Sequence, residues 1–306
     1  MGIYILRRLL LAVGVIVGVS IITFILAFMV PADPARVYAG SNATAQTVAQ
    51  IREQLGLNRP LLVQYFDYVT RALHGDFGTS YKLQTPVLSA ITSRFPYSAV
   101  LALAGIVVEL LVGVPVGILA AVRPRSWIDR STMGLALLGV SAPQFWLGLI
   151  LLYTFGYLLP IFPLGLAQSP SSIVLPAVTV GLGGGVWYAR LLRSSLLETL
   201  ATDYVRTGRA KGLSRWAVIF RHALPNAITP IVTQIGLDMA YFLGGIVVVE
   251  SVFGWPGVGQ LAYQAIQNDD IPLIMGTVLF SAVVIVLINI CTDLLYALLN
   301  PRVVYE

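Results

Sequence analysis

The run LLLAVGVIVGVSIITFILAFMV, residues 9–30, decides the fold class, because it is uncharged and long enough to cross a bilayer as one helix. A membrane helix needs about 20 apolar residues, each adding about 1.5 Å of length. A secretory signal has an apolar core of only about 7 to 15 residues, followed by a small-residue cleavage site. No clean site of that kind follows directly, so we predict that the run is retained as a membrane anchor.

The composition of the whole chain agrees with this prediction. Of the 306 residues, 57% are hydrophobic and 11% are charged, and the mean hydropathy is +0.84. Soluble domains carry about 25% charged residues. One cysteine cannot form an internal disulfide, and two histidines and one cysteine are too few soft ligands for a protein-only zinc or iron–sulfur site. The composition predicts an all-α integral membrane protein. Counting leaves an all-carboxylate metal site open, but we predict no metal-binding residues.

Six segments are long and apolar enough, or nearly so, to cross the membrane. They are residues 9–30, 99–122, 133–159, 173–189, 227–249 and 272–299. The fourth is short, and we expect the residues after it to extend it. Residues 1–306 are therefore predicted to form a single domain with six transmembrane helices.

The basic residues orient these spans, because Lys and Arg in short loops resist translocation and stay on the cytoplasmic side. Most of the 19 basic residues fall on one face of the expected topology. They are Arg7, Arg8, Arg123, Arg125, Arg130, Arg190, Arg193, Arg206, Arg209, Lys211, Arg215, Arg221 and Arg302. We expect this face and both termini to be cytoplasmic. The loop 31–98 is long enough to cross regardless of its charges and is predicted to be extracytoplasmic.

Two outer connections show local order. In loop 31–98, Val48, Ile51 and Leu55 share one helical face and Gly56 stands where a helix would end, which predicts a small helical cap. Connection 251–271 has a glycine- and proline-rich turn followed by one short apolar helical face, which predicts a segment folded back onto the bundle. That turn contains Gly254, Trp255, Pro256, Gly257 and Gly259, and the apolar face contains Leu261, Ala262, Ala265 and Ile266.

The cytoplasmic loop 190–226 is amphipathic and predicts a helix, a corner and a second helix. Residues 195–211 carry an apolar side with Leu196, Leu197, Leu200 and Tyr204. Gly212 can close this helix in the left-handed conformation, and Ser214 can cap the next one. The second helix, residues 215–223, presents Trp216, Ile219, Phe220 and Ala223 on one face, and Pro225 is expected to end it. The pattern alone leaves two roles open, which are docking a partner and lying on anionic lipid.

The order of residues in this loop resembles a known motif. YVRTGRAKGLS, residues 204–214, followed by Leu224 and Pro225, resembles the EAA loop of ATP-binding-cassette importer permeases, which reads E-A-A, three residues, G, nine residues, I, any residue, L, P. The match holds at Gly212, Leu224 and Pro225. It departs at the three positions 206–208, which are Arg, Thr and Gly here, and at His222, where the motif has Ile.

These departures resemble the oligopeptide/dipeptide/nickel permease family, whose version reads close to D-Y-I/V-R-T-A-R-A-K-G. Further similarities, spread over nearly the whole chain, occur in the expected order. They are Arg7-Arg8, Asp33-Pro34, GDFGTS at 75–80, GGIVVVESVFGWPG at 244–257 and Asn300-Pro301-Arg302.

The resemblance implies a permease subunit of a bacterial or archaeal cytoplasmic membrane. It would pair with a homologous second permease, two cytoplasmic ATPases and an extracytoplasmic substrate-binding protein, without nucleic acid. ATP and Mg would be bound by the ATPases, so this chain would carry no cofactor and would not itself be an enzyme. Peptides are the favoured substrates, with nickel or another small solute as the alternative.

The resemblance also assigns the ATPase-coupling loop residue by residue. Its members would be Arg206, Thr207, Gly208, Arg209, Ala210, Lys211, Gly212, Leu213, Ser214, Arg215, Trp216, Ile219, Phe220, Leu224 and Pro225. Movement of this loop with the ATPases would drive alternating access.

Four carboxylates lie in or beside the predicted spans, where an unpaired charge costs about 2.5 to 3.5 kcal/mol on insertion scales. Glu109 and Asp238 lie nearer the middle and are our candidates for the translocation path. Glu250 and Asp293 lie near span ends, and we expect them to be structural. The glycines at 181 and 183–185 lack the Lys-Ser or Lys-Thr of a phosphate-binding loop, so they predict close helix packing.

Two other protein classes fit less well. A self-sufficient secondary transporter or channel predicts inverted repeats, and no convincing internal repeat is present. A membrane enzyme needs a catalytic constellation, and the chain has neither a Gly-x-Ser-x-Gly motif nor a histidine within a span.

Overall fold

The computed structural model describes residues 2–29, 33–40, 42–127, 129–134 and 142–299, and within these ranges it contains helices and no strand. Val30, Pro31, residues 135–141 of the third predicted span and the motif at 300–302 lie outside the described residues. The helices are α1 (Gly2–Met29), α2 (Pro34–Ala39), α3 (Ala45–Gln54), α4 (Leu61–Leu73), α5 (Val87–Val122), α7 (Gln144–Leu152), the π-helix η1 (Tyr153–Leu158), the 3-10 helix η2 (Pro170–Ile173), α8 (Val174–Leu200), α9 (Asp203–Ala210), α10 (Arg215–Val218), the π-helix η3 (Ile219–Ala223), α11 (Leu224–Ala227), α12 (Thr229–Leu243), α13 (Val247–Val252), α14 (Val258–Gln267) and α15 (Ile271–Leu299). The all-α prediction is confirmed in these ranges.

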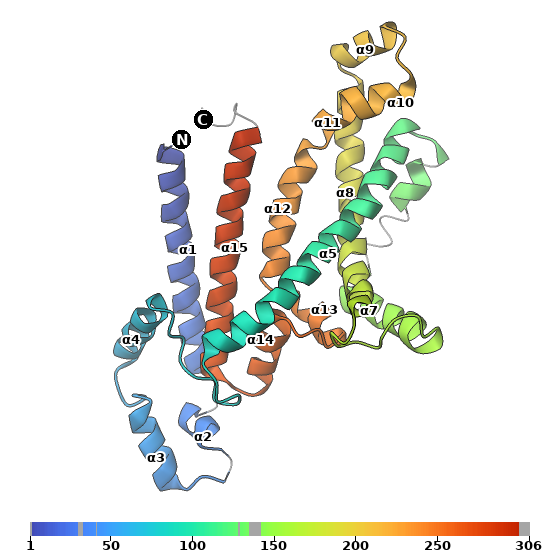
Figure 1. Cartoon of the computed structure of the whole chain (residues 1–306). Helices are drawn as coiled ribbons and strands as arrows, with labels where there is room; N and C mark the ends of the chain where they lie inside the picture. Colours follow the sequence, from blue (N-terminus) through green and yellow to red (C-terminus); the bar gives the residue numbers. More distant parts are fainter. Residues whose placement is uncertain (1, 30–32, 41, 128, 135–141, 300–306) are drawn as a thin grey trace. The chain divides into compact units, whose positions relative to one another are not determined.

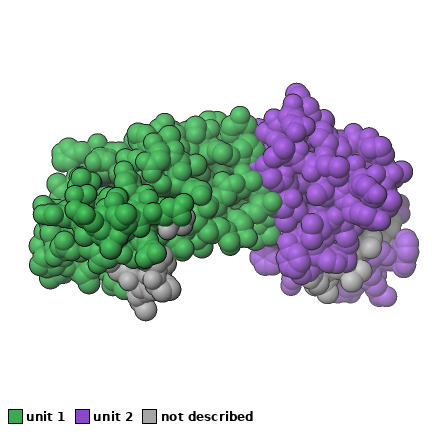
Figure 2. All heavy atoms as spheres, turned by 90° about the horizontal axis from the view of Figure 1, so that it is seen from below, with its two compact units in different colours: residues 1–99, 243–251, 256–306 green, residues 100–242, 252–255 purple. Residues whose placement is uncertain are grey.

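The chain divides into two compact units (Figure 2). Unit 1 comprises residues 1–99, 243–251 and 256–306, and unit 2 comprises residues 100–242 and 252–255. Neither unit is a contiguous piece of sequence, so each depends on segments far apart along the chain.

Unit 1 is built on the first and last helices, α1 and α15, which lie side by side (Figure 1). An ion pair of 2.8 Å joins Arg8 of α1 to Asp293 of α15, in line with the structural role expected for Asp293. Tyr68 of α4 is buried in one cluster with Phe24 of α1 and Met275 of α15. The outer helix α4 is thereby packed onto the helix pair.

Helix α3 of unit 1 ends next to Gly56, the glycine that was predicted to stop it. Thr44 caps the start of α3 by accepting the Thr47 amide at 3.2 Å. Gly56 has φ +68° and donates its amide to the Glu53 carbonyl at 3.0 Å. A left-handed φ favours glycine, so the predicted stop after Leu55 is confirmed.

The predicted fold-back of connection 251–271 is also confirmed. Leu261 and Ala265 of α14 are buried in one cluster with Val87 and Ile91 at the start of α5, and with Leu273 of α15. Another member of the predicted apolar face, Ile266, remains 58% exposed. Fewer apolar residues of α14 are therefore buried than the sequence pattern predicts.

Unit 2 is organised by a close crossing of α5 and α8. A Cβ built on Gly113 of α5 would lie 2.5 Å from the Cβ of Tyr188, and one on Gly181 of α8 would lie 2.5 Å from the Cβ of Val108. Side chains at these positions would force the helices apart, as expected where small residues line a membrane-helix interface. The predicted packing role of the glycine cluster is confirmed, except at Gly183, which has no atom within 4 Å of a built Cβ.

Among the described residues, four helices are long and apolar enough to cross a membrane: Leu6–Ala27, Val87–Val122, Pro170–Leu200 and Ile271–Leu294. The helix Val87–Val122 begins earlier than the predicted span 99–122, and the helix Pro170–Leu200 extends beyond the predicted span 173–189, as expected. The apolar helix Gln144–Leu158 is shorter, because Pro143 has extended backbone and α7 begins after it. The predicted span 227–249 is interrupted, since α12 ends at Leu243 and Gly245 turns the chain with φ +111° before α13. The count of six spans remains a prediction.

Candidate functional site

The loop predicted to be cytoplasmic contains a helix–corner–helix segment, residues 203–225, which we call the elbow. The single helix expected over residues 195–211 is wrong, because α8 continues to Leu200 and α9 starts only at Asp203. Between them Thr202 takes an extended conformation with ψ 153°, and its hydroxyl donates to the Thr199 carbonyl at 2.6 Å. A threonine that bonds its own turn in this way competes with helix continuation.

The corner of the elbow forms as predicted. Gly212 has φ +79° and donates its amide to the Arg209 carbonyl at 3.0 Å. Two residues later, the Ser214 hydroxyl accepts the Ala217 amide at 3.3 Å and caps α10. The left-handed glycine and the serine cap together set the change of direction between the two arms.

The second arm does not end at Pro225. Its α10 passes through the π-helix η3 into α11, and Pro225 lies in the first turn of α11. The Leu224 amide bonds the Ile219 carbonyl five residues back. Proline has no amide hydrogen to donate, and a widened π turn before it lets the helix continue. The expectation that Pro225 stops the helix is therefore wrong.

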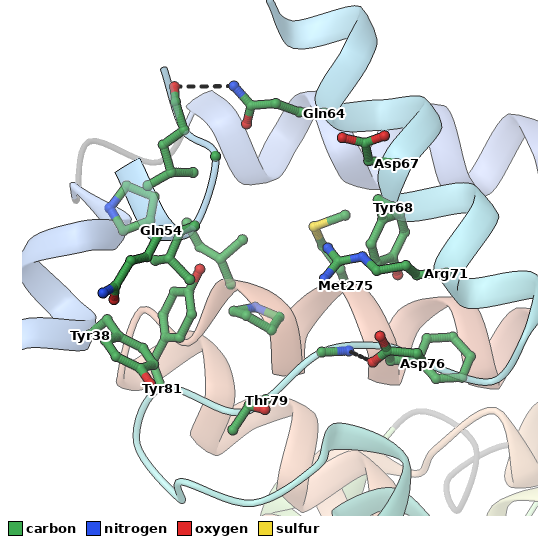
Figure 3. A pocket seen from close by; sticks show the side chains of 18 of the residues that line it. Tyr38, Gln54, Gln64, Asp67, Tyr68, Arg71, Asp76, Thr79, Tyr81 and Met275 are labelled. Atoms are coloured by element: carbon green, nitrogen blue, oxygen red, sulfur yellow. Dashed lines mark hydrogen bonds between the residues drawn. The ribbon is translucent and has the colours of Figure 1, made fainter. Parts of the chain in front are cut away.

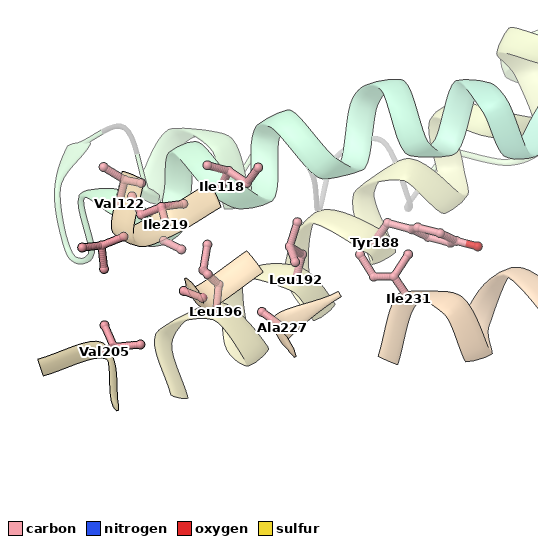
Figure 4. Close-up of a cluster of buried hydrophobic side chains, with 12 residues drawn as sticks. Ile118, Val122, Tyr188, Leu192, Leu196, Val205, Ile219, Ala227 and Ile231 are labelled. Carbon is pink, nitrogen blue, oxygen red and sulfur yellow. The ribbon is translucent and has the colours of Figure 1, made fainter. Parts of the chain in front are cut away.

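The inner face of the elbow is packed against the ends of α5 and α8 (Figure 4). Val205, Val218, Ile219 and Ala223 are at most 2% exposed. They share one apolar cluster with Ile118, Val122, Leu192 and Leu196. Leu224 packs against this cluster, and the Arg215 guanidinium donates to the Val122 carbonyl. The elbow is thus held to its helices by both apolar and polar contacts.

The outer face carries aromatic and basic side chains. Trp216 and Phe220 are 50% and 53% exposed, and their rings stack at 5.8 Å. The prediction that these two share a face with Ile219 and Ala223 is wrong, because only Ile219 and Ala223 point into the core. The other exposed side chains of this face are Tyr204, Arg206, Thr207, Arg209, Ala210, Lys211, Leu213, Ser214, Arg221 and Pro225.

Among residues 206–211 of the coupling loop, only Gly208 is buried. A Cβ built there would lie 3.7 Å from His222 Cδ2 and 3.8 Å from Leu213 Cδ1, which is ordinary contact distance. Alanine, the residue of the family pattern at this position, would therefore fit.

An ion pair that the sequence pattern did not reveal joins α8, which leads into the elbow, to the connection after α5. Arg193 of α8 bonds both carboxylate oxygens of Asp129, at 2.6 and 2.7 Å, and Asp129 also accepts the Arg125 amide at 2.8 Å. Asp129 is only 4% exposed. The hydrogen bonds from Arg193 hold the pKa of Asp129 below its usual range. This pairing fixes the connection after α5 to α8.

The two carboxylates predicted for the translocation path lie near one tyrosine. The Tyr188 hydroxyl donates to Asp238 at 2.8 Å, and the Gln234 amide donates to the other oxygen of Asp238 at 3.0 Å. Tyr188 also interacts electrostatically with Glu109. Glu109 is 1% exposed, and its Oε2 atom has no hydrogen-bond partner in the structure. Three helices, α5, α8 and α12, therefore contribute to one polar cluster within unit 2.

Glu250 of α13, in unit 1, has a different environment, because its carboxylate contacts the start of α14. Its carboxylate accepts the Ser98 hydroxyl at 2.7 Å and the Gln260 amide at 2.8 Å, and the Ser98 oxygen accepts the Val258 amide at 2.8 Å. A Cβ on Gly257 would lie 2.2 Å from this carboxylate, so glycine is needed for the close approach. The contacts of Glu250 agree with the structural role expected for it.

Comparisons with known proteins identify the family. Residues 113–305 match the binding-protein-dependent transport system inner membrane component, and residues 1–102 match the N-terminal part of such a membrane component. The glutathione transport system permease protein GsiC of Salmonella typhimurium (strain LT2) is 41% identical over 303 residues, covering 99% of both chains. GsiC of Escherichia coli (strain K12) is 39% identical with the same coverage.

A solved structure shares the fold. The inward-facing MetNI methionine ABC transporter matches with a TM-score of 0.57 at 19% identity, covering 68% of this chain and 95% of that chain. With family models that match along most of its length and full-length relatives near 40% identity, the chain belongs to the binding-protein-dependent transport system inner membrane components, the permease subunits of ATP-binding-cassette importers.

Proposed function

We propose that this subunit imports short peptides across the cytoplasmic membrane of its cell, together with a homologous second permease. One of two ATPases would dock on the elbow, the other would dock on the second permease, and an extracytoplasmic binding protein would deliver the peptide. Both termini and the elbow would face the cytoplasm, with six spans crossing the membrane. The names of the relatives support the substrate class, because glutathione is a small γ-linked tripeptide.

The observation that carries the coupling role is the division of the elbow into two faces. Its inner face is buried, so the elbow moves with α5 and α8, while its outer face exposes stacked Trp216 and Phe220 beside cations. Coupling between subunits needs such an element, which is rigid and can be displaced as a unit. Exposed aromatic and arginine side chains are also the residue types enriched at protein interfaces.

The test purifies the permease from its native membrane in mild detergent and identifies bound proteins by mass spectrometry. We expect an ATPase pair and a second permease with the native chain, and loss of the ATPases with Trp216→Glu or Gly212→Pro. Gly212→Pro acts on the corner, since proline cannot adopt φ +79°. Trp127→Glu is the matched control, because Trp127 is 81% exposed and lies outside the elbow.

ATP-driven uptake of a labelled tripeptide into proteoliposomes should be lost in the same two variants and retained in the control, with membrane insertion intact. Normal uptake by both elbow variants would overturn the docking assignment. A native chain that purifies alone would instead favour an elbow that lies on lipid.

We further propose that Glu109 and Asp238 border the translocation path. A buried carboxylate oxygen without a partner is costly, and such groups in membrane helices commonly mark a path for solutes.

A further inference from the structure

The outer segment of unit 1 encloses a cavity of about 740 Å³ (Figure 3). Its walls come from α3, α4 and the loop at residues 76–81, and its floor from α1 and the first turns of α15. A volume between about 300 and 1,000 Å³ is typical of sites that bind small molecules. No residue of the elbow or of the polar cluster around Tyr188 lines this cavity.

One residue that lines this cavity has a buried polar atom without a partner inside the protein. Tyr68 of α4 is 8% exposed, and its hydroxyl forms no hydrogen bond in the structure. Burial raises the pKa of Tyr68 to about 12, so the hydroxyl keeps its proton at neutral pH. A buried hydroxyl without a partner costs free energy, and a ligand oxygen in the cavity would remove that cost.

The charges around the cavity are of both signs. Figure 3 shows the Arg71 guanidinium extending from α4 toward the middle of the cavity, close to Tyr68 and Met275. Among the described residues, Arg71 forms no salt bridge, whereas neighbouring Arg59 pairs with Asp67 at 2.9 Å. The carboxylates of Glu53 and Asp76 also line the cavity and form no salt bridge in the part of the chain described.

The loop at residues 76–81, which forms one wall of the cavity, is fixed by hydrogen bonds to Asp270. Asp270, which is fully buried, accepts the Ser80 hydroxyl at 2.5 Å and the amides of Tyr81 and Lys82 at 3.1 and 3.0 Å. The Tyr81 ring also packs edge-on against Tyr38 at 5.4 Å. A wall fixed in this way is largely pre-formed, which reduces the entropy lost when a ligand binds.

We propose that this cavity binds a short peptide with free termini, whose carboxylate lies against the Arg71 guanidinium and the Tyr68 hydroxyl. The peptide ammonium would face Glu53 and Asp76, and one apolar side chain would cover Met275 and Phe77. The inference rests on the proposed peptide import, and it adds a peptide site on the permease itself, on the side where a binding protein would release its cargo.

The test measures binding of the labelled tripeptide Ala-Leu-Ala to the full permease pair in nanodiscs without binding protein. We expect the native protein to bind the free acid about tenfold or more tightly than the C-terminal amide, because the amide has no charge for Arg71. Arg71→Gln should weaken binding of the acid by a similar factor and abolish the preference over the amide. Arg36→Gln is the matched control, since Arg36 is exposed on α2 and does not line the cavity.

Tyr68→Phe keeps the packing of the ring and removes only the hydroxyl, so weaker binding by this variant would come from the lost hydrogen bond. Equal affinity of the native and Arg71→Gln proteins for the acid would overturn the proposal. A permease pair that retains its ATPases and imports the tripeptide with binding protein, but shows no binding of its own, would refute the cavity site and leave the proposed function standing. Binding without import would do the reverse.

Discussion

The buried carboxylates of unit 1 differ from Glu109 of unit 2 in their hydrogen bonding. In unit 1, Glu250 and Asp270 are fully buried, and hydroxyl and amide groups from distant segments bond both oxygens of each. In unit 2, Glu109 is as deeply buried but leaves Oε2 without a partner. A buried carboxylate whose oxygens are both hydrogen-bonded stabilises the structure. A buried carboxylate with an unbonded oxygen destabilises the fold, and such groups in membrane helices commonly serve a function. The comparison therefore predicts that Glu250 and Asp270 are structural and that Glu109 has a function, and substitutions can test both.

The largest effect is expected from Glu250→Ala. Removing the carboxylate leaves the Ser98 hydroxyl and the Gln260 amide without their acceptor, and each buried group left unpaired costs about 1 to 3 kcal/mol. We expect a loss of about 3 kcal/mol, measured as a lower apparent melting temperature in detergent. A melting temperature equal to that of the native protein would show that Glu250 does not hold the start of α14.

The next largest effect is expected from Gly184→Ala, which probes the space beside Glu109. A Cβ at this position would lie 1.7 Å from Glu109 Oε1 and 2.5 Å from its Cδ, so the carboxylate has to move. We expect a destabilisation of about 1 to 3 kcal/mol with impaired uptake. Gly183→Ala is the matched control, because its Cβ meets nothing within 4 Å and alanine favours helix.

Adding Glu109→Ala to Gly184→Ala should restore most of the lost stability, since it removes the clashing side chain. If the double variant is no more stable than Gly184→Ala, the clash is not with Glu109 and the cluster is less tightly packed than the structure indicates.

A smaller effect on stability, with a larger one on transport, is expected from Glu109→Gln. The amide keeps the shape of the side chain and replaces a carboxyl group whose Oε2 atom has no partner, so the melting temperature should not fall. Uptake of the labelled tripeptide should fall by about tenfold, or about 1.4 kcal/mol, if this carboxyl group borders the path. ATPase co-purification serves as the control for assembly. A lower melting temperature with normal uptake would place Glu109 with the structural carboxylates.

The smallest effect concerns pH and the Asp129–Arg193 pair. Because the native pKa of Asp129 is lowered, its ionised form stabilises the fold at pH values above the unfolded pKa of about 4. This contribution is lost as pH falls through the native pKa. Melting curves between pH 7 and 3 should therefore drop more steeply for the native protein than for Asp129→Asn. Parallel curves would contradict the role assigned to this pair.

Local features of the site could be predicted from sequence, because they depend on neighbouring residues. A glycine followed two residues later by a serine was enough to predict the corner at Gly212 and Ser214, and small residues in a span predicted the packing of α5 on α8. Which residues of α10 and η3 are buried could not be predicted in the same way. Apolar residues occupy more than one side there, and only the positions of α5 and α8 decide that Ile219 is buried while Phe220 is exposed.

Contacts between residues far apart in the sequence could not be predicted either. Ser80 and Asp270 are separated by 190 residues, and neither belongs to a spacing that signals their contact. Asp129 and Arg193 are 64 residues apart and both appear in the sequence as ordinary loop or span-end charges. The carboxylates at 109 and 238 were identified from their depth in the spans, but their shared contact with Tyr188 emerges only in three dimensions.

The bond between Asp270 and the segment at 80–82 also sets an order for biogenesis. At a synthesis rate of about 5 to 20 residues per second, a ribosome needs roughly 10 to 40 seconds to travel from one partner to the other. During that interval the segment at 80–82 has been synthesised, but the acceptor that fixes it does not yet exist. The local structure of this segment is therefore completed late, when the residues just before the final helix are made, and a nascent chain halted before residue 270 leaves the Ser80 hydroxyl and the amides of Tyr81 and Lys82 without their acceptor.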